Sequence, residues 1–466
     1  MNGNLFKEFS PVTAQQWKEQ IVKDLKGIDF NELVWNTNSG LNIKPFYTSE
    51  DLKQQAPPLF TESNWDICEN ITVTNEKEAN AIALSALAGG ASGLSFYIHK
   101  KIDTKILLKD ISLEYIYTQF FISNDALHVL NDLKDIYGKS NAFDGKLKCF
   151  VNIDSLSLLA FYGEWHKDEE KDLSVLKQLI HIPVNVSLYQ EAGANTVNEL
   201  AIGLAHLNEY FNYLEHQKEL KNKTLHFTFS IGGDFFNEIV KLRAFRKLLA
   251  LLQVQYKIKF PVHIHAQTSL INKSSLDSYT NMLRTTTEGM SAVIGGSNSL
   301  CVLPFNEGFE KTVSTLQQAQ GTKGESDFSS RISRNQQHIL KDESYLGKTA
   351  EIAAGSYYLE TLTEQLAEKA WEQFKIIESN GGFIACLKNN FIQNLISKDA
   401  ETLITQVKEG KMVLVGVNKY QNQKEEIRNV KLEILNEHKT PFKPIKPIRL
   451  SQSFEKNAST SSATKK

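Results

Sequence analysis

The chain has 466 residues with 41% hydrophobic and 10% aromatic side chains, enough for one large domain with extensions or for two or three smaller domains. Its 52 Lys and Arg residues nearly balance 54 Asp and Glu residues, and no basic run interleaves with aromatic residues, which argues against nucleic-acid binding. Since the N-terminus has no apolar signal core and no stretch approaches the roughly 20 apolar residues that cross a bilayer, we expect a soluble, cytoplasmic protein without a membrane partner.

The N-terminal segment 1–60 is predicted to be an arm without a core of its own. Ser10 and Pro11 are typical of a helix start, apolar residues follow at i+4 spacing, and Gly27 is typical of the helix end. The segment 28–60 then carries large aromatic residues between turn residues. Because such an arm gains little free energy alone, we expect it to lie on the main domain or on another subunit.

From about residue 75 to residue 360, apolar and β-branched runs alternate with helical stretches. The runs predicted to be strands are 93–98, 113–122, 147–153, 184–189, 225–231, 262–269, 290–296 and 356–360. Eight strands with intervening helices favour a (β/α)8 TIM barrel over an open sheet. We therefore predict an α/β protein with the barrel over residues 61–380.

The segment after the barrel is predicted to be a helical extension, residues 381–450. The last barrel helix is expected to start at Thr361 and Glu364, which have the spacing of a capping box. Further helix follows, and then an apolar strand at 412–420. Residues 451–466 are rich in Ser, Thr and Lys without a core-forming face, which predicts a disordered tail.

Few residues suggest chemistry by themselves. Glu191 follows an apolar run at a predicted strand end, where parallel α/β folds build sites, although capping or pairing with a Lys is the commoner role. His263 and His265 alternate on one strand and so share a face, but without a third ligand they indicate packing or hydrogen bonding. The loop 295–300 lacks the Lys of a P-loop and is interpreted as a tight turn.

The remaining polar and sulfur-containing groups have ordinary interpretations. The basic residues of 241–249 predict a solvated helix face. Four cysteines lie far apart without a C-x-x-C motif, which predicts reduced core thiols and no structural metal site: Cys68, Cys149, Cys301 and Cys386. The residues alone therefore predict a barrel with a few polar strand ends and no self-evident reaction.

In their order along the chain, these segments resemble the acyl-CoA mutase barrel of the adenosylcobalamin-dependent methylmalonyl-CoA mutase family. The resemblance covers nearly the whole chain and runs through FSPVTAQQWKEQIVKDLKG, ELVWNTNSGLNIKPFYT, YQEAGA, GGDFFNEIVKLRAFR, HAQTS, MLRTTTEGMSAVIGGSNSL, SDFSSRISRNQQHIL, GSYYLETLTEQLAEKAW and GKMVLVGVNKY. The arm, with WNT-x-x-G-L and KPFYT, is more similar to the small, β-type chain of the heterodimeric enzymes than to the large chain.

The resemblance implies a barrel that binds acyl-CoA and holds adenosylcobalamin against a C-terminal flavodoxin-like domain. That domain supplies a histidine to the cobalt from a D-x-H-x-x-G motif, which this sequence does not contain. We therefore expect no cobalamin-binding flavodoxin-like domain here, and a cofactor bound mainly by the partner chain.

The family's catalytic strand reads S-G-Y-H-M-Q-E-A-G-A. Aligning it on Gln190 and Glu191 puts Leu188 at the position of the catalytic histidine. Leucine can neither donate a hydrogen bond to a thioester carbonyl nor act as a general acid, so we predict no catalytic residue in this chain. The family's R-x-Y-A-G tyrosine has no match around 64–73, and the short stretch 124–146 lacks its V-R-N-T arginine.

Four residues still match family positions at or near the cofactor face: Glu191, His265, Gln267 and Glu307. They are either remnants of a cofactor-binding site or residues that hold the barrel mouth in shape.

Three hypotheses follow. In the first, the chain is the small, non-catalytic subunit of a heterodimeric methylmalonyl-CoA mutase, an isomerase of propanoate metabolism, and its arm contacts the large (alpha) subunit, which interconverts methylmalonyl-CoA and succinyl-CoA. In the second, it is an active barrel subunit whose cobalamin domain is a separate chain, against which Leu188 argues. In the third, it is a scaffold or CoA-binding protein unconnected with mutase chemistry. Acyl-CoA binding by the barrel is left open.

Overall fold

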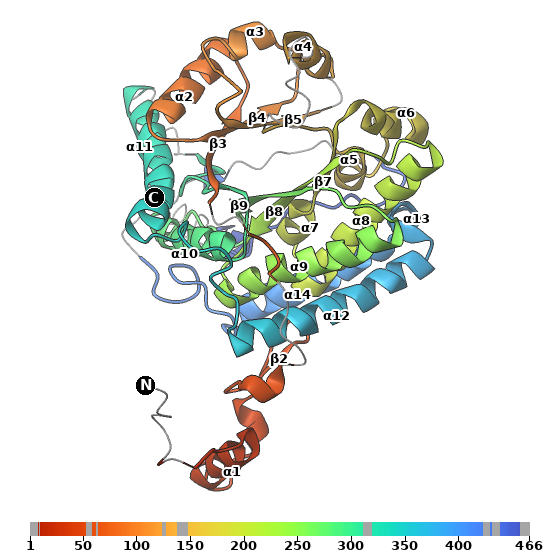
Figure 1. Ribbon diagram of the computed structural model, residues 1–466. Coiled ribbons are helices and arrows are strands. Elements are labelled where there is room, and N and C mark those ends of the chain that lie inside the picture. The colour runs from red at the N-terminus through yellow and green to blue at the C-terminus, as the bar shows by residue number, and fades with distance from the viewer. Residues whose placement is uncertain are drawn as a thin grey trace, which may run out of the picture.

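The computed structural model describes residues 8, 10–52, 58–61, 64–123, 127–137, 148–310, 319–422, 429–430 and 439–456. Its centre is an eight-stranded parallel sheet rolled nearly into a barrel (Figure 1). The strands are β3 (Asp66–Thr72), β4 (Gly93–Ile98), β5 (Tyr117–Ile122), β6 (Cys149–Asn152), β7 (His181–Asn185), β8 (Thr224–Ile231), β9 (Val262–Thr268) and β10 (Ser299–Cys301). They are ordered β6-β5-β4-β3-β10-β9-β8-β7, and the predicted α/β class with a TIM-type barrel is confirmed.

Side chains join β6 to β7, the two strands at the ends of this order. The Nε2 atom of His181 donates to the Val151 carbonyl oxygen at 3.0 Å. The carboxylate of Asp154, just after β6, accepts from the backbone N–H of Asn185 at 2.6 Å. Because an open strand edge would leave backbone groups unpaired, these bonds complete the barrel at its seam.

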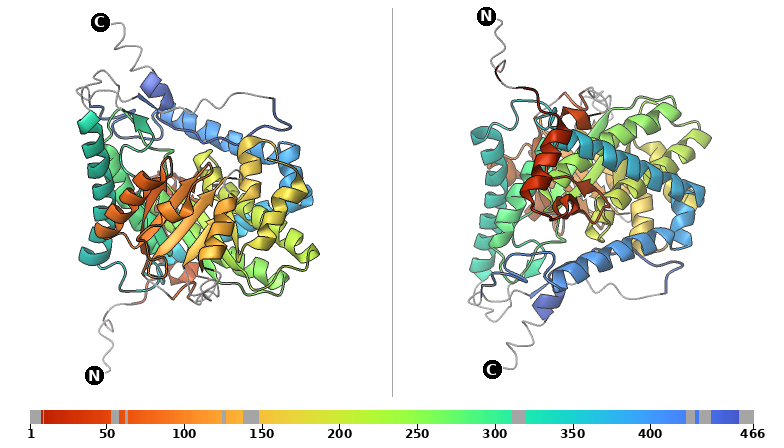
Figure 2. Two further views of the ribbon diagram at one scale, coloured as in Figure 1. Left: turned by 90° about the horizontal axis from the view of Figure 1, so that it is seen from above. Right: turned by 90° about the horizontal axis from the view of Figure 1, so that it is seen from below.

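Helices surround the sheet and bury its outer face (Figures 1 and 2). Along the barrel they are α2 (Glu76–Ala88), α3 (Thr104–Leu107), α4 (His128–Tyr137), α5 (Ser155–Tyr162), α6 (Glu169–Ser174), η5 (Val175–Gln178), α7 (Ser187–Glu191), α8 (Thr196–His216), α9 (Phe235–Gln255), α10 (Thr280–Ile294), α11 (Ala319–His338), η6 (Ile339–Glu343) and α12 (Tyr357–Ser379). The predicted helical extension is confirmed by α13 (Gly382–Lys388) and α14 (Phe391–Lys408). None of the helices in the described ranges is long and apolar enough to cross a membrane.

The strand count was right, but two of the predicted strands, 290–296 and 356–360, were wrong, and a third, 184–189, shares only residues 184 and 185 with β7. The chain leaves β7 at Asn185, so 187–191 is helix α7, while 290–294 ends α10 and 357–360 begins α12. Short apolar runs in buried helices cannot be told from strands by periodicity. The sequence also missed β3, whose polar DICENIT faces a polar barrel interior on one side and pairs Glu69 with Arg334 of α11 on the other.

The last strand, β10, comes from the loop 295–300 that the sequence predicted to be a tight turn. The apolar stretch 412–420 is not a strand but a turn with one bridge between Val415 and Lys419. Its apolar side chains pack with α14 into a second hydrophobic cluster instead. Helix α12 starts after Ser356, which caps it, and not at Thr361.

The arm consists of α1 (Ala14–Asp24), η1 (Phe30–Leu33), the hairpin β1 (Trp35–Asn36) and β2 (Asn42–Ile43), and η2 (Ser49–Asp51). Helix α1 is capped by Thr13 and not by Ser10, and it buries no residue. It stands away from the barrel below α12 (Figure 1). The hairpin, by contrast, is anchored: Leu41 is 1% exposed and belongs to the main core.

The first residues of the predicted disordered tail, 451–456, belong to the folded part of the chain. Ser451 and Glu455 are buried, and the Ser451 hydroxyl donates to the Lys273 carbonyl oxygen at 2.8 Å. Residues 457–466 lie outside the described residues, as does most of the stretch 124–146.

Candidate functional site

The interior of the barrel is filled by side chains that meet from opposite walls. Tyr117 on β5 and His263 on β9, four strands apart in the ring, stack with centroids 4.8 Å apart and planes at 8°. The Tyr117 hydroxyl donates to Gln119 Oε1 at 2.9 Å and lies 2.9 Å from Nε2 of His226 on β8. Since one hydroxyl has one proton, Tyr117 accepts from His226, whose Nε2 must carry hydrogen.

A second layer closes the axis nearer the carboxyl ends of the strands. The Tyr97 hydroxyl on β4 lies 3.4 Å from Gln267 Oε1 on β9, and the amide of Asn70 lies 3.4 Å from the same hydroxyl. The two layers together fill the barrel axis with side chains.

The histidines of this interior are uncharged at neutral pH. Burial lowers the pKa of His181 to about 4 and the pKa of His265 to about 3. Burial, followed by the neighbouring imidazoles, also holds the pKa values of His226 and His263 well below the usual range. Among the described residues, no group of three or more His, Cys, Asp or Glu is placed to hold a metal ion.

Glu191 joins helix α7 to the end of β8 and to the loop after β9. It is the last residue of α7 and is 8% exposed. Its carboxylate accepts from the Ser230 hydroxyl at 2.7 Å and from the backbone N–H of Leu270 at 3.1 Å. Burial raises the pKa of Glu191 above its usual value. Both carboxylate bonds point into the protein, which fits a structural role at the barrel mouth.

The structure brings three of the four residual family positions together. Gln267 lies 3.5 Å from the Ser230 hydroxyl that also bonds Glu191. His265 is fully buried on the same strand, with Nδ1 2.9 Å from Ser299 Oγ. Only Glu307, in the loop after β10, is exposed.

These hydrogen bonds show which polar groups are available to adenosylcobalamin, the cofactor that the resemblance implies. The polar atoms of Glu191 and Gln267 are engaged with protein groups, and His265 has no exposed surface. These three residues therefore present no free hydrogen-bonding group to a large cofactor, whereas Glu307 is exposed. Cofactor binding by the four residues stays a prediction.

Leu188 lies on α7, one turn before the carboxyl end of the helix. It is 6% exposed and belongs to the main hydrophobic core. A side chain at this position is therefore packed against apolar neighbours, and the leucine contributes to the core rather than to a polar site.

The segment 442–455, here called the C-terminal strap, crosses the loops at the carboxyl end of the barrel. The backbone N–H groups of three strap residues donate to carbonyl oxygens of α5, of α7 and of the loop after β9: Ile445 to Ala160 at 2.8 Å, Ile448 to Glu191 at 2.8 Å and Leu450 to Ile271 at 2.9 Å. The strap thereby fastens the C-terminal extension to the face on which parallel barrels build their sites.

Sequence reasoning missed the buried charges of α9. Lys241 and Arg243, predicted to be solvated, are 0% and 1% exposed. The Lys241 ammonium lies 3.1 Å from Glu199 and 2.5 Å from Glu238, and it donates to the Ser230 carbonyl oxygen at 2.8 Å. The partner Glu199 is on another helix, so spacing along α9 gave no signal for this cluster.

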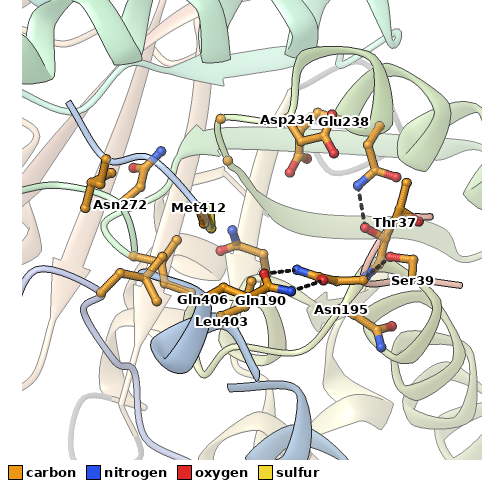
Figure 3. Close-up of a pocket in the computed structure, with 18 of the residues that line it drawn as sticks. Thr37, Ser39, Gln190, Asn195, Asp234, Glu238, Asn272, Leu403, Gln406 and Met412 are labelled. Atoms are coloured by element: carbon orange, nitrogen blue, oxygen red, sulfur yellow. Dashed lines mark hydrogen bonds between the residues drawn. The ribbon is translucent and has the colours of Figure 1, made fainter. Parts of the chain in front are cut away.

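A cavity of about 890 Å³ opens beside the strap, between the arm hairpin, the loops after β7 and β8, α10 and α14 (Figure 3). The hairpin is fixed at its rim by a reciprocal amide pair, in which Asn38 and Gln406 donate to each other at 2.9 and 2.7 Å. The backbone N–H of Thr196 donates to Ser39 Oγ at 3.3 Å.

Known proteins match this chain over most of its length. A family model described as methylmalonyl-CoA mutase matches residues 97–463. The methylmalonyl-CoA mutase small subunit of Porphyromonas gingivalis is 34% identical, over 90% of this chain and 71% of that protein. The methylmalonyl-CoA mutases of Cereibacter sphaeroides and of human mitochondria are 28% and 27% identical, each over 88% of this chain. The chain spans 64% and 61% of the length of these last two relatives.

Proposed function

The chain belongs to the methylmalonyl-CoA mutase family, and on that premise we propose that it is the small, non-catalytic subunit of a cytoplasmic, heterodimeric methylmalonyl-CoA mutase. Its partner is a large subunit that interconverts methylmalonyl-CoA and succinyl-CoA. Adenosylcobalamin supplies the radical chemistry and is held mainly by the large subunit. The small subunit contributes a folded barrel that stabilises its partner.

The contact between Tyr117 and His263 across the barrel is the observation that carries this proposal. A CoA thioester threaded along the axis would have to separate these two rings. Tyr117 is also bonded to Gln119, and His263 Nε2 lies 3.0 Å from Ser299 Oγ. Because close-packed, hydrogen-bonded side chains separate only at a cost in free energy, the axis is unsuited to an acyl-CoA tail.

The mouth of the barrel supports the same proposal. Leu188 supplies neither a hydrogen-bond donor nor a proton at the position of the family's histidine. The carboxylate of Glu191 is held by Ser230 and Leu270 and is not aimed at a substrate. Electrostatic stabilisation of a reacting thioester needs preorganised donors, which these residues do not supply.

The arm supports the assignment of a partner. Several of its large apolar side chains are exposed: Val12, Trp17, Val22, Ile28, Leu33 and Trp35. Apolar side chains gathered on one projecting segment are typical of a surface that another subunit covers.

The proposal is tested with the isolated chain and with its co-expressed large subunit. The isolated chain should bind no succinyl-CoA in a calorimetric titration and should not convert methylmalonyl-CoA when adenosylcobalamin is added. Co-expression should yield a complex in which the large subunit is active. Turnover by this chain without the large subunit, alone or with a separate cobalamin-domain protein, would overturn the non-catalytic assignment.

A further inference from the structure

The cavity beside the C-terminal strap has an apolar wall that faces outward. Four of its lining side chains are large, apolar and exposed by 45% to 70%: Trp35, Leu283, Val413 and Val415. They come from the arm, from α10 and from the loop after α14, and so gather from distant parts of the sequence (Figure 1). Exposed apolar side chains around one concave surface are typical of a binding site, since each remains in water until it is covered.

The lining of the cavity has more acidic than basic side chains: Glu199, Asp234, Glu238 and Asp399 against Arg284 and Lys411. The carboxyl groups of Glu199 and Glu238, here called the acidic floor, line the cavity, and both residues are more than nine-tenths buried. They share a single cation, Lys241, which stands behind them. Glu199 Oε1 and Glu238 Oε2 receive no hydrogen bond from the described residues beyond that ion contact. Two buried carboxyl groups therefore share one ammonium, and both can be ionised only if a further cation approaches them.

The protonation state of Glu199 is consistent with two carboxyl groups sharing one cation. Burial raises the pKa of Glu199 to about 8, even though Lys241 opposes the shift. Glu199 is therefore largely protonated at neutral pH while the cavity holds no cation. A cation that entered would favour the ionised carboxylate and release the proton.

Two glycines leave space in front of the carboxyl groups. A Cβ atom on Gly232 would lie 3.2 Å from Gln190 Nε2 and 3.2 Å from Glu238 Oε1. A Cβ atom on Gly233 would lie 3.2 Å from Asn272 Nδ2. Side chains at either position would fill the space in front of the acidic floor.

We propose that this cavity is a socket for a lysine or arginine side chain, flanked by apolar residues, on the large partner subunit. The inference rests on the proposed function and deepens it by naming the chemistry of the contact. The cationic head pairs with the acidic floor and the apolar neighbours cover the exposed wall. The arm hairpin forms the rim of the cavity, so a partner subunit that binds the hairpin lies next to the socket.

The test measures the affinity of the purified large subunit for three variants of this chain. Glu199→Gln reproduces the protonated form without its ability to ionise, and Thr287→Arg adds a further cation at an exposed position in the lining. Glu372→Gln, on the exposed face of α12, is the matched control. Both socket variants should weaken binding at pH 8 at least about tenfold, and the control should not.

The pH dependence separates a binding role from a structural one. Affinity of the wild-type chain should rise from pH 7 to pH 9 as Glu199 ionises, and this rise should vanish in Glu199→Gln. If wild type binds the large subunit while both variants keep its affinity and its pH profile, the socket is refuted and the proposed function stands. If wild type does not bind the large subunit at all, both are refuted.

Discussion

The rings of Tyr117 and His263 stack 4.8 Å apart across the barrel, and the Tyr117 hydroxyl lies 2.9 Å from His226 Nε2. Two strand walls that would otherwise enclose a channel are thereby joined through their side chains. We therefore expect the side chains on the barrel axis to contribute to stability, and this can be tested by substitution.

Tyr117→Phe keeps the stacked ring but removes the hydroxyl that bonds His226 and Gln119. Because the buried imidazole loses its acceptor, the free energy of unfolding should fall by about 1–3 kcal/mol. Chemical denaturation monitored by circular dichroism measures it. Tyr115→Phe, at a residue 84% exposed, is the matched control and should change stability by less than about 0.5 kcal/mol. Equal stability of both variants would contradict the role given to the Tyr117 hydroxyl.

Leu188→His restores the family's residue but should restore no mutase activity. The new imidazole would be buried among apolar side chains, and the other groups with which the family's histidine acts are not supplied. Unfolding should become easier by about 1–3 kcal/mol, since a polar group is buried without a partner. Measurable conversion of methylmalonyl-CoA by this variant without the large subunit would contradict the proposal that side chains on the barrel axis prevent acyl-CoA from binding.

As the pH falls, the free energy of unfolding should begin to decrease at a higher pH than the protonation of surface carboxylates alone would cause. The folded-state pKa values of His181 and His265, about 4 and about 3, lie below the unfolded value of about 6.5. Their contribution is present above pH 6.5 and is lost as the pH falls toward the folded-state values, by about 1.4 kcal/mol per pH unit for each histidine. Denaturation midpoints at pH 7.5, 6 and 5 measure the slope. A flat profile across this range would show that the histidines already bind protons in the folded barrel.

Asp154→Asn should loosen the seam between β6 and β7. The carboxylate accepts from the Asn185 backbone, from His206 Nε2 at 3.0 Å and from the Tyr210 hydroxyl at 2.6 Å. An amide cannot accept all three bonds, so we expect a loss of about 3–5 kcal/mol. Hydrogen exchange should quicken first in β6 and β7. Asp342→Asn, in an exposed pair with His338, should have no such effect.

Deleting residues 1–34 should abolish co-purification with the large subunit and leave the barrel folded. The deletion removes α1, which buries no residue, and spares Leu41 and the amide pair of Asn38 with Gln406. Pull-down of the large subunit, with a thermal melt of each form, provides the measurement.

Two single substitutions refine the arm test. Trp17→Ser removes one exposed ring of the arm and should weaken recovery of the large subunit. Val254→Ser, at a residue 69% exposed near the end of α9, should not. If the form without residues 1–34 recovers as much large subunit as the full-length chain does, residues 1–34 are not part of the interface.

Parts of this protein were determined by its sequence alone. The alternation of apolar runs with helical stretches indicated a barrel, because each strand and helix must bury one face. The order of short motifs indicated the family. Leu188, at the position of the family's catalytic histidine, indicated that this residue is missing here. These features depend on residues that are close together in the sequence, so they can be predicted without the tertiary structure.

Only the tertiary structure decided what the polar residues do. Lys241 is a buried counterion and not a solvated base because Glu199, on another helix, faces it. Tyr117 fills the axis because β5 and β9 stand opposite each other once the sheet is rolled. The polar strand β3 and the C-terminal strap are stabilised by partners far along the chain. Spacing in the sequence encodes neighbours on one element, whereas burial and pairing depend on which elements meet, and that is set only when the barrel closes.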